Sequence, residues 1–210
     1  ADPLPAVLRL SALDLLKYIH PALSAGEDAR RRFEEAARAI HWYELLYTGE
    51  VIQRWQVYFL CLTAEMDDDA MDGICSRLAI PSRYRALFCA ARRDDHATLA
   101  RLERRRSREA PQESELYRFL SPCPAELLLY LMARCGSEKI RRWISHFVTH
   151  LRDVAVCLDG NDLKQLGIPP GPRYKEILAA LLDARLNGRV ATREDERTWV
   201  RKRYLRAPSG

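Results

Sequence analysis

Apolar residues recur at three- and four-residue spacing along nearly all of this chain, whereas segments that alternate apolar and polar positions are scarce. The first pattern puts apolar side chains on one face of a helix, and the second would be needed for half-buried strands. Glycine and proline interrupt the pattern, for example at Pro21, Gly49, Pro81 and Asn187-Gly188. We therefore predict an all-α fold, in which an elongated multi-helix body precedes a small helical tail.

The predicted helices cover residues 11–19, 27–47, 52–63, 68–78, 82–91, 96–105, 113–120, 124–134 and 137–156 in the body, and 161–166, 172–186 and 193–204 in the tail. Between residues 103 and 115 a run of arginines meets Pro111, and we expect a mobile loop there. We place the helical body at residues 1–158 and the basic tail at residues 159–210.

The chain has 210 residues, 48% of them hydrophobic, so it can bury a substantial core. Its six cysteines form no Cys-x-x-Cys pair and fall mostly inside apolar helical patterns, which favours reduced thiols and a cytoplasmic location. The strongest apolar run, residues 127–133, is much shorter than the roughly 20 residues of a membrane span, so we expect no membrane association. Because the chain starts Ala-Asp-Pro without Met and shows no signal-peptide pattern, we expect an excised fragment.

The formal net charge of +5 is concentrated in the tail. From Gly160 onward there are 11 Lys and Arg against 6 Asp and Glu, so the residues before Gly160 sum to zero. A local positive field of this kind suits a polyanion, although basic residues along a surface helix are also common as a solvated face. Charge placement alone leaves both interpretations open.

The tail also contains a glycine- and proline-rich turn between two predicted helices, which runs from Leu166 to Pro172 as Leu-Gly-Ile-Pro-Pro-Gly-Pro. Gly167 and Gly171 allow backbone geometries that a side chain would penalise, and Pro172 fits a first helical position. The residues after Pro172 have early N–H groups without intrahelical partners, so we expect this helix start to suit a phosphate.

Several motifs resemble the C-terminal RNA-binding region of the bacterial tRNA nucleotidyltransferase and poly(A) polymerase family, whose members add CCA, or its final A, to tRNA 3′ ends. The resemblance is carried by Gly-Asn-Asp-Leu at 160–163, the turn at 166–172, Leu-Asn-Gly at 186–188 and Thr-Arg-Glu-Asp at 192–195. His-Trp-Tyr-Glu-Leu-Leu-Tyr-Thr-Gly-Glu at 41–50 and Leu-Ala-Ile-Pro at 78–81 resemble the helical body of these enzymes more weakly.

The resemblance implies that this chain is a non-catalytic, tRNA-binding portion of an ATP- and CTP-dependent tRNA nucleotidyltransferase, which positions the tRNA 3′ end for addition. It implies two partners, tRNA and an N-terminal catalytic head. The head requires a glycine-rich turn and two strand carboxylates that hold Mg²⁺, and the sequence contains neither. We therefore expect Mg²⁺ and ATP or CTP to bind only to the head, with no cofactor in this chain.

The residues expected to contact RNA lie around the turn and along the last helix, and they are Lys164, Gly167, Gly171, Arg173, Tyr174, Lys175, Arg193, Arg197 and Arg201. Further basic residues of the tail that could bind RNA are Arg185, Arg189, Lys202 and Arg203. Arg173 and Lys175 are the best placed, beside the helix start. Tyr174 could stack on a base or belong to the core, and an aromatic residue at this position is more often core.

The last helix is predicted to carry one basic stripe. Arg193, Arg197 and Arg201 recur at four-residue spacing, while Trp199 faces the opposite side and packs. Thr192 and Asp195 have the spacing of a capping box, so we expect the helix to begin there with an acidic first turn.

We predict no metal site and no catalytic residue in this chain. His146 and His150 lie four positions apart, which would put them on one helix face, but no third ligand is evident. Without a convergent group of carboxylates, nucleophile or metal ligands, an independent enzymatic activity is disfavoured.

The alternative function is a helical protein-interaction or dimerisation scaffold with no RNA affinity of its own, in which the tail only confers solubility. Aromatic residues are dense in two adjacent predicted helices, at Trp42, Tyr43, Tyr47, Trp55, Tyr58 and Phe59. Aromatic residues of this kind lie in a hydrophobic core more often than in an interface, and a homodimer would require them to lie in an interface.

Overall fold

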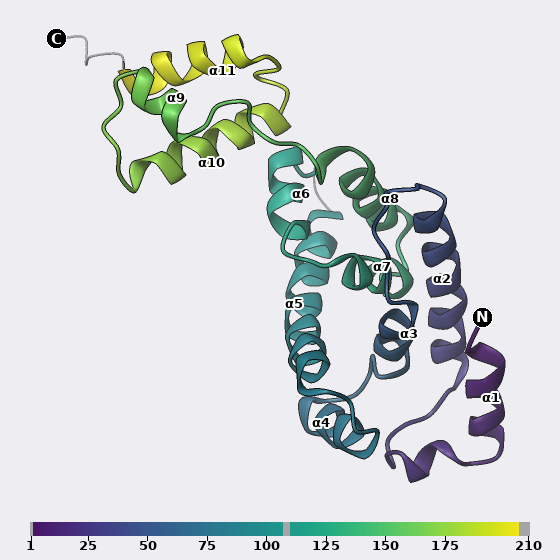
Figure 1. Ribbon diagram of the computed structural model, residues 1–210. Helices are drawn as coiled ribbons and strands as arrows, with labels where there is room; N and C mark the ends of the chain where they lie inside the picture. The colour runs from purple at the N-terminus through teal and green to yellow at the C-terminus, as the bar shows by residue number, and fades with distance from the viewer. Residues whose placement is uncertain (1, 107–109, 206–210) are drawn as a thin grey trace. The chain divides into compact units, whose positions relative to one another are not determined.

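The computed structural model describes residues 2–106 and 110–205 of the chain. Every regular element in these two ranges is a helix, which confirms the all-α prediction (Figure 1). The α-helices are α1 Leu4–Ala12, α2 Glu27–Glu44, α3 Arg54–Leu62, α4 Asp68–Arg77, α5 Ser82–Arg106, α6 Glu113–Leu120, α7 Ala125–Arg134, α8 Glu138–His146, α9 Gly160–Gln165, α10 Arg173–Leu186 and α11 Arg193–Val200. Three short elements join them, a 3₁₀ turn η1 at Leu16–Tyr18 and π-helical turns η2 at Phe147–Leu151 and η3 at Arg201–Leu205.

Some predicted boundaries are wrong. The helix predicted at 11–19 is replaced by α1 and η1, which are separated at Asp14, where φ is +54°. The helices predicted at 82–91 and 96–105 are one helix, α5, because no glycine or proline interrupts the polar stretch between them. The helix predicted at 137–156 is α8 followed by η2. In the loop expected at 103–115, residues 107–109 lie outside the described residues.

The chain divides into two compact units. Unit 1 contains residues 1–109 and 122–144, and unit 2 contains residues 110–121 and 145–210. The predicted tail, 159–210, lies wholly within unit 2, together with α6 and η2. Whether the tail alone behaves as a domain stays a prediction.

Unit 1 is built around α2, α3 and α7, which contact one another. The residues of α7 from Leu127 to Ala133 are buried, as are Phe33 and Tyr43 of α2. A smaller apolar cluster joins η1 to α4 through Leu16, Met66 and Ile74. None of the helices in the described ranges is both long and apolar enough to cross a membrane.

Unit 2 has its own apolar core, formed by residues of α9, α10, α11 and the segments between them. The buried members are Leu158, Leu163, Ile168, Ile177, Leu181, Ala184, Val190 and Val200. Helix α6 packs on α10 and on η2. This core holds the three tail helices in the arrangement from which the candidate site is built.

The turn between α9 and α10 follows the predicted pattern in part. Gly167 has a φ of +89°, a backbone geometry that a side chain would penalise, as expected. Gly171 is not in this left-handed region. Pro172 is the residue before α10 rather than its first residue, and it has helical φ and ψ angles of −55° and −28°.

Candidate nucleic-acid interface

Helix α11 is fixed to the rest of unit 2 by a buried glutamate. The Glu196 side chain is fully buried, and its Oε2 accepts hydrogen bonds from the backbone N–H groups of Cys157 at 2.8 Å and Leu158 at 3.0 Å. Its Oε1 accepts a 2.5 Å hydrogen bond from Nη1 of Arg185, which lies on α10. One carboxylate therefore links α10, α11 and the segment at Cys157 and Leu158 that leads into α9.

A second buried carboxylate, Asp162 of α9, binds two arginines of α11. Its Oδ1 lies 2.6 Å from Arg193 Nη2 and 3.4 Å from Arg197 Nη2. Its Oδ2 accepts the N–H of Asp159, which completes a capping box at the start of α9. Mainly because of the hydrogen bond from Arg193, the pKa of Asp162 is lowered below its ordinary value, so the carboxylate is ionised at neutral pH.

These contacts change the predicted basic stripe. Arg193 and Arg197 turn toward Asp162, whereas Arg201 begins the π-helical turn η3 and is exposed. The three arginines therefore do not form a single stripe of free cations. Trp199 packs against the core of unit 2, as predicted, and the capping box of Thr192 and Asp195 is confirmed.

The remaining predicted cations face solvent. Lys164, Arg173, Lys175 and Arg201 are exposed, and none of them has a carboxylate partner among the described residues. They belong to α9, the start of α10 and the turn η3 that follows α11, and α9, the start of α10 and the end of α11 lie at the same end of unit 2 (Figure 1). We call this group of residues, with Lys202, the basic end.

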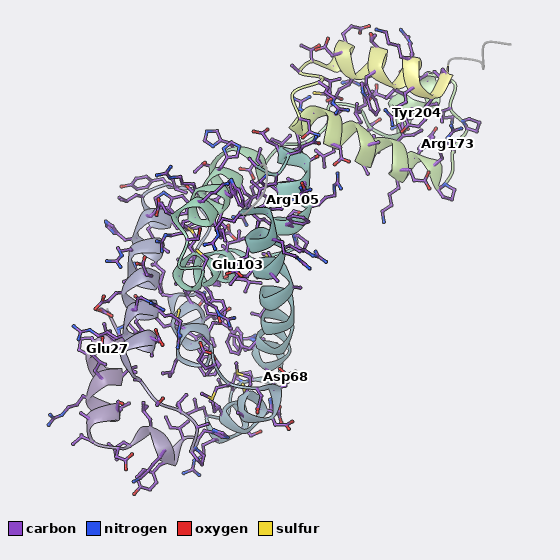
Figure 2. All side chains as sticks on the ribbon, turned by 180° about the vertical axis from the view of Figure 1, so that it is seen from behind. Glu27, Asp68, Glu103, Arg105, Arg173 and Tyr204 are labelled. Atoms are coloured by element: carbon purple, nitrogen blue, oxygen red, sulfur yellow. The ribbon has the colours of Figure 1, made fainter. Side chains whose placement is uncertain are left out.

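Two arginines near the basic end lie over aromatic rings. The guanidinium carbon of Arg173 is 5.6 Å from the ring centre of Tyr204, and that of Arg203 is 5.3 Å from the ring of Trp199. The two rings are themselves 6.1 Å apart, and Figure 2 labels Arg173 and Tyr204 on this part of unit 2. Cation–π contact restrains each guanidinium while its N–H edges remain available to a ligand.

Tyr174, in contrast, is committed to the fold. Its hydroxyl donates to the carbonyl oxygen of Ile168 at 2.8 Å, and its ring packs on the core of unit 2. A Cβ at Gly160 would lie 3.4 Å from this ring, so the glycine leaves room for it. The structure thus gives Tyr174 a core role and presents Tyr204 and Trp199 next to the exposed arginines.

The start of α10 is less open to a phosphate than predicted. The N–H of Tyr174 donates to the carbonyl of Gly171 at 3.0 Å, and the N–H of Lys175 donates to that of Pro172 at 3.1 Å. Two of the early amides that we expected to be without partners are therefore satisfied by the turn. At this helix start the exposed cationic side chains, rather than these two backbone amides, are the groups without a partner in the fold that an anion could contact.

His146 and His150 stack on each other, with ring centres 4.9 Å apart. His146 Nε2 lies 2.9 Å from Glu113 Oε1, so one member of the pair already has a carboxylate partner. Within residues 2–106 and 110–205, no group of three or more His, Cys, Asp or Glu side chains is arranged to hold a metal ion.

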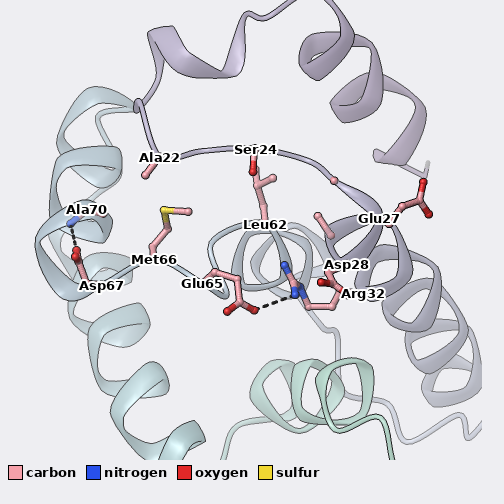
Figure 3. Close-up of a pocket in the computed structure, with 12 residues that line it drawn as sticks. Ala22, Ser24, Glu27, Asp28, Arg32, Leu62, Glu65, Met66, Asp67 and Ala70 are labelled. Atoms are coloured by element: carbon pink, nitrogen blue, oxygen red, sulfur yellow. Dashed lines mark hydrogen bonds and ion pairs between the residues drawn. The ribbon is translucent and has the colours of Figure 1, made fainter.

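Unit 1 contains a cavity of about 480 Å³ with the opposite character (Figure 3). Arg32 is its only cation, and it donates to the Cys61 carbonyl at 3.1 Å and to Glu65 at 3.0 Å. Carboxylates of Glu27, Asp28 and Asp67 also line it. A surface with this excess of negative charge disfavours a polyanion, so this cavity is a poor candidate for the interface.

The fold is that of the helical region of CCA-adding enzymes. A solved Thermotoga maritima CCA-adding enzyme complexed with tRNA-CCA matches with a TM-score of 0.77 at 18% identity, over 95% of this chain and 47% of that one. A CCA-adding enzyme in apo form II matches with a TM-score of 0.75 at 21% identity, over 95% of this chain and 45% of that one. No family model matches the chain.

A curated sequence relative adds to this likeness of fold. An A-adding tRNA nucleotidyltransferase of Geobacter sulfurreducens is 42% identical over 196 residues, which make up 93% of this chain and 22% of the relative. The chain belongs to the tRNA nucleotidyltransferase family and matches its C-terminal region, as its motifs predicted. It spans about a fifth of the length of this curated relative.

Proposed function

We propose that this chain is the non-catalytic tRNA-binding portion of a tRNA nucleotidyltransferase, and that unit 2 holds the tRNA while a separate head adds the 3′-terminal nucleotides. The observation that carries the proposal is the basic end, whose exposed cations have no carboxylate partner among the described residues. One of them, Arg173, lies over the ring of Tyr204, and Arg203 lies over that of Trp199 nearby. In this proposal Mg²⁺ and ATP or CTP belong to the head, and the protein acts in the cytoplasm.

The expected contacts are with the RNA backbone and shape. Arginine and lysine side chains on a convex helical surface reach phosphate oxygens, and they do not enter the deep, narrow major groove of A-form RNA. Binding should therefore depend strongly on salt and weakly on sequence. If four or five cations each neutralise a phosphate, the slope of log K against log salt concentration is about −3 to −4.

The test is a tRNA titration of the chain at two salt concentrations, with the variant Arg173→Glu/Lys175→Glu. The matched control is Arg9→Glu/Arg104→Glu, because both control arginines are exposed in unit 1 and have no carboxylate partner among the described residues. We expect salt-sensitive binding that the Arg173 and Lys175 changes weaken for all tRNA species alike and that the control retains. A flat salt dependence, or equal losses in both variants, would contradict the proposal.

One observation favours the alternative of an interaction or dimerisation scaffold. Helix α1 has no buried residue, and apolar side chains of α1 and the following segment are exposed, by 37% at Leu10, 51% at Leu13 and 65% at Tyr18. Scattered exposed apolar residues are common, but a run of them can mark an interface. Light scattering over a concentration series would detect self-association, which the tRNA-binding proposal does not require.

A further inference from the structure

Unit 2 has a polar cavity of about 200 Å³ away from the turn that the sequence singled out. It is formed between α6, the C-terminal half of α10, and the end of α11 with η3, and we call it the α6–α10 niche. Its lining includes three arginines, Arg118, Arg189 and Arg203, together with Asn187 and Trp199. A cavity of this size is below the roughly 300–1,000 Å³ of pockets for drug-sized ligands, so it suits one small charged group.

The charges of the niche do not cancel. Arg118 forms a two-point ion pair with Asp183, at 3.3 Å and 3.1 Å, and this pair is electrically neutral. Arg189 and Arg203 are exposed and have no carboxylate partner among the described residues. Two free guanidinium groups therefore remain beside a neutral polar wall, which is the composition of an anion site.

The walls of the niche are held in place before any ligand arrives. Asn187 Nδ2 donates to Ser114 Oγ at 2.9 Å, and Asn187 Oδ1 accepts the Ser114 N–H at 3.1 Å. Gly188, with a φ of +68°, follows the C-terminal end of α10, and the N–H of Arg189 donates back to the Ala184 carbonyl at 2.8 Å. This turn directs the chain so that Arg189 lies at the niche.

Arg203 is restrained by its contact with the Trp199 ring, at 5.3 Å. Trp199 is itself packed on the core of unit 2, so the guanidinium rests on a fixed surface. Guanidinium groups positioned in this way lose less side-chain freedom when they bind, which favours a specific contact over a diffuse charge effect.

A second cavity adjoins the niche, and Arg189 and Asn187 line both. The second cavity has a volume of about 460 Å³ and also includes Pro111, Glu113 and Gly188. Its one carboxylate, Glu113, is paired with His146 at 2.9 Å. Two cavities that share an arginine in their lining fit a continuing chain of phosphates and sugars better than a single free phosphate.

We propose that the α6–α10 niche binds a backbone phosphodiester of the RNA held by unit 2, with Arg189 and Arg203 as its cationic ligands. The proposal rests on the proposed function, because it assumes that unit 2 binds RNA. It adds a second phosphate contact remote in sequence from Arg173 and Lys175. The sequence placed Arg189 and Arg203 only among the basic residues of the tail, and the structure brings them to one niche.

The experiment measures binding of a tRNA transcript to the full chain at 50, 100 and 200 mM salt, chosen as about the range over which phosphate contacts dominate. The test variant is Arg189→Gln/Arg203→Gln, and the charge-matched control is Arg9→Gln/Arg104→Gln. Each lost phosphate contact should reduce the salt slope by about 0.9, so the test variant should lose nearly two units of slope and at least about tenfold in affinity at 100 mM. The control should retain the slope of the wild type.

A second variant, Arg189→Lys/Arg203→Lys, separates a phosphate contact from a structural role. It keeps both charges, so it should retain most of the salt slope even if it binds a few-fold more weakly. If the Gln variant behaves as the control does while the wild type binds tRNA, the niche proposal is wrong and the proposed function stands.

Absence of tRNA binding by the wild type at low salt would overturn the proposed function, and the niche proposal with it. In that case, a titration of the chain with inorganic phosphate tests whether the niche binds free anions instead. The probe is the indole N–H signal of Trp199 in a nitrogen–proton correlation spectrum, assigned with Trp199→Phe. A saturable shift that is lost in Arg189→Gln/Arg203→Gln would identify a free-phosphate site rather than an RNA contact.

Discussion

Removal of the Glu196 carboxylate should destabilise unit 2 more than any other single change to a charged residue of α11. The side chain is fully buried and satisfies three donors at once, the N–H groups of Cys157 and Leu158 and the guanidinium of Arg185. In Glu196→Ala all three donors lose their acceptor. The Arg185 side chain is 25% exposed and Cys157 is an exposed residue, whereas Leu158 is buried.

The magnitude follows from these contacts. Breaking a buried ion pair by removing one partner costs about 3–5 kcal/mol, and each buried N–H left without an acceptor costs about 1–3 kcal/mol. The terms overlap, because water can enter the space that the side chain leaves, so we expect about 3–5 kcal/mol in total for Glu196→Ala. Glu196→Gln keeps an acceptor oxygen for the backbone amides and should cost about 1–3 kcal/mol.

Urea denaturation followed by circular dichroism measures the free energy of unfolding, and hydrogen exchange measures the protection of the Cys157 and Leu158 amides directly. The control is Glu194→Ala, because Glu194 is an exposed residue of the same helical turn. We expect the control to change stability by less than about 0.5 kcal/mol and to leave amide protection intact. Faster exchange at Cys157 and Leu158 should appear only in the Glu196 variants.

A double-mutant cycle tests the pairing itself. Arg185→Met removes the guanidinium, so Glu196→Gln should cost less in that background, with a coupling of about 1 kcal/mol or more. The reasoning is refuted if Glu196→Ala costs less than about 1 kcal/mol, or if the Arg185 and Glu196 changes are strictly additive.

Three further predictions concern single residues of unit 2. The pKa of Asp162 is lower in the folded chain than the unfolded value of about 3.9, so its ionised carboxylate stabilises the fold above that value. This stabilisation is lost as the pH falls through the folded pKa. Thermal melts of Asp162→Asn should therefore show a weaker acid destabilisation than those of the wild type, and identical pH profiles would contradict this. Gly167→Ala should cost about 1–2 kcal/mol through its left-handed φ alone, since nothing lies within 4 Å of a Cβ there, and a urea midpoint equal to that of the wild type would disprove the strain. Asn187→Ala should cost about 0.5–2 kcal/mol because it removes the acceptor that caps the Ser114 N–H, and increased hydrogen exchange in α6 is the readout.

Features that depend on local sequence could be predicted. The fold class followed from apolar spacing, and the start of α11 from the Thr192 and Asp195 spacing, because both patterns act within a few residues. The same local signals misplaced α1 and divided α5, since a polar stretch without glycine or proline can continue a helix when its ends pack well.

The buried carboxylates could not be found in this way. Asp162 and Glu196 look like other acidic residues of a first helical turn. What distinguishes Asp162 is contact with arginines 31 and 35 positions away, and what distinguishes Glu196 is contact with an arginine 11 positions away. Only packing of the tail helices brings these groups together. Asn187 was a plausible helix end in the sequence, but its contact with Ser114 spans 73 positions and gave no local signal.

The structure changes what the charge of the tail means. Sequence counting treats its 11 lysines and arginines as equivalent, yet Arg185, Arg193 and Arg197 neutralise buried carboxylates and so act within the fold. An arginine that is already paired with a carboxylate releases few counterions from RNA. The measured slope of log K against log salt concentration should therefore reflect the number of remaining exposed cations of the tail rather than all 11. A slope that fell on changing Arg173 or Arg189, but not on changing Arg197, would show that the fold itself selects which basic residues are available to the nucleic acid.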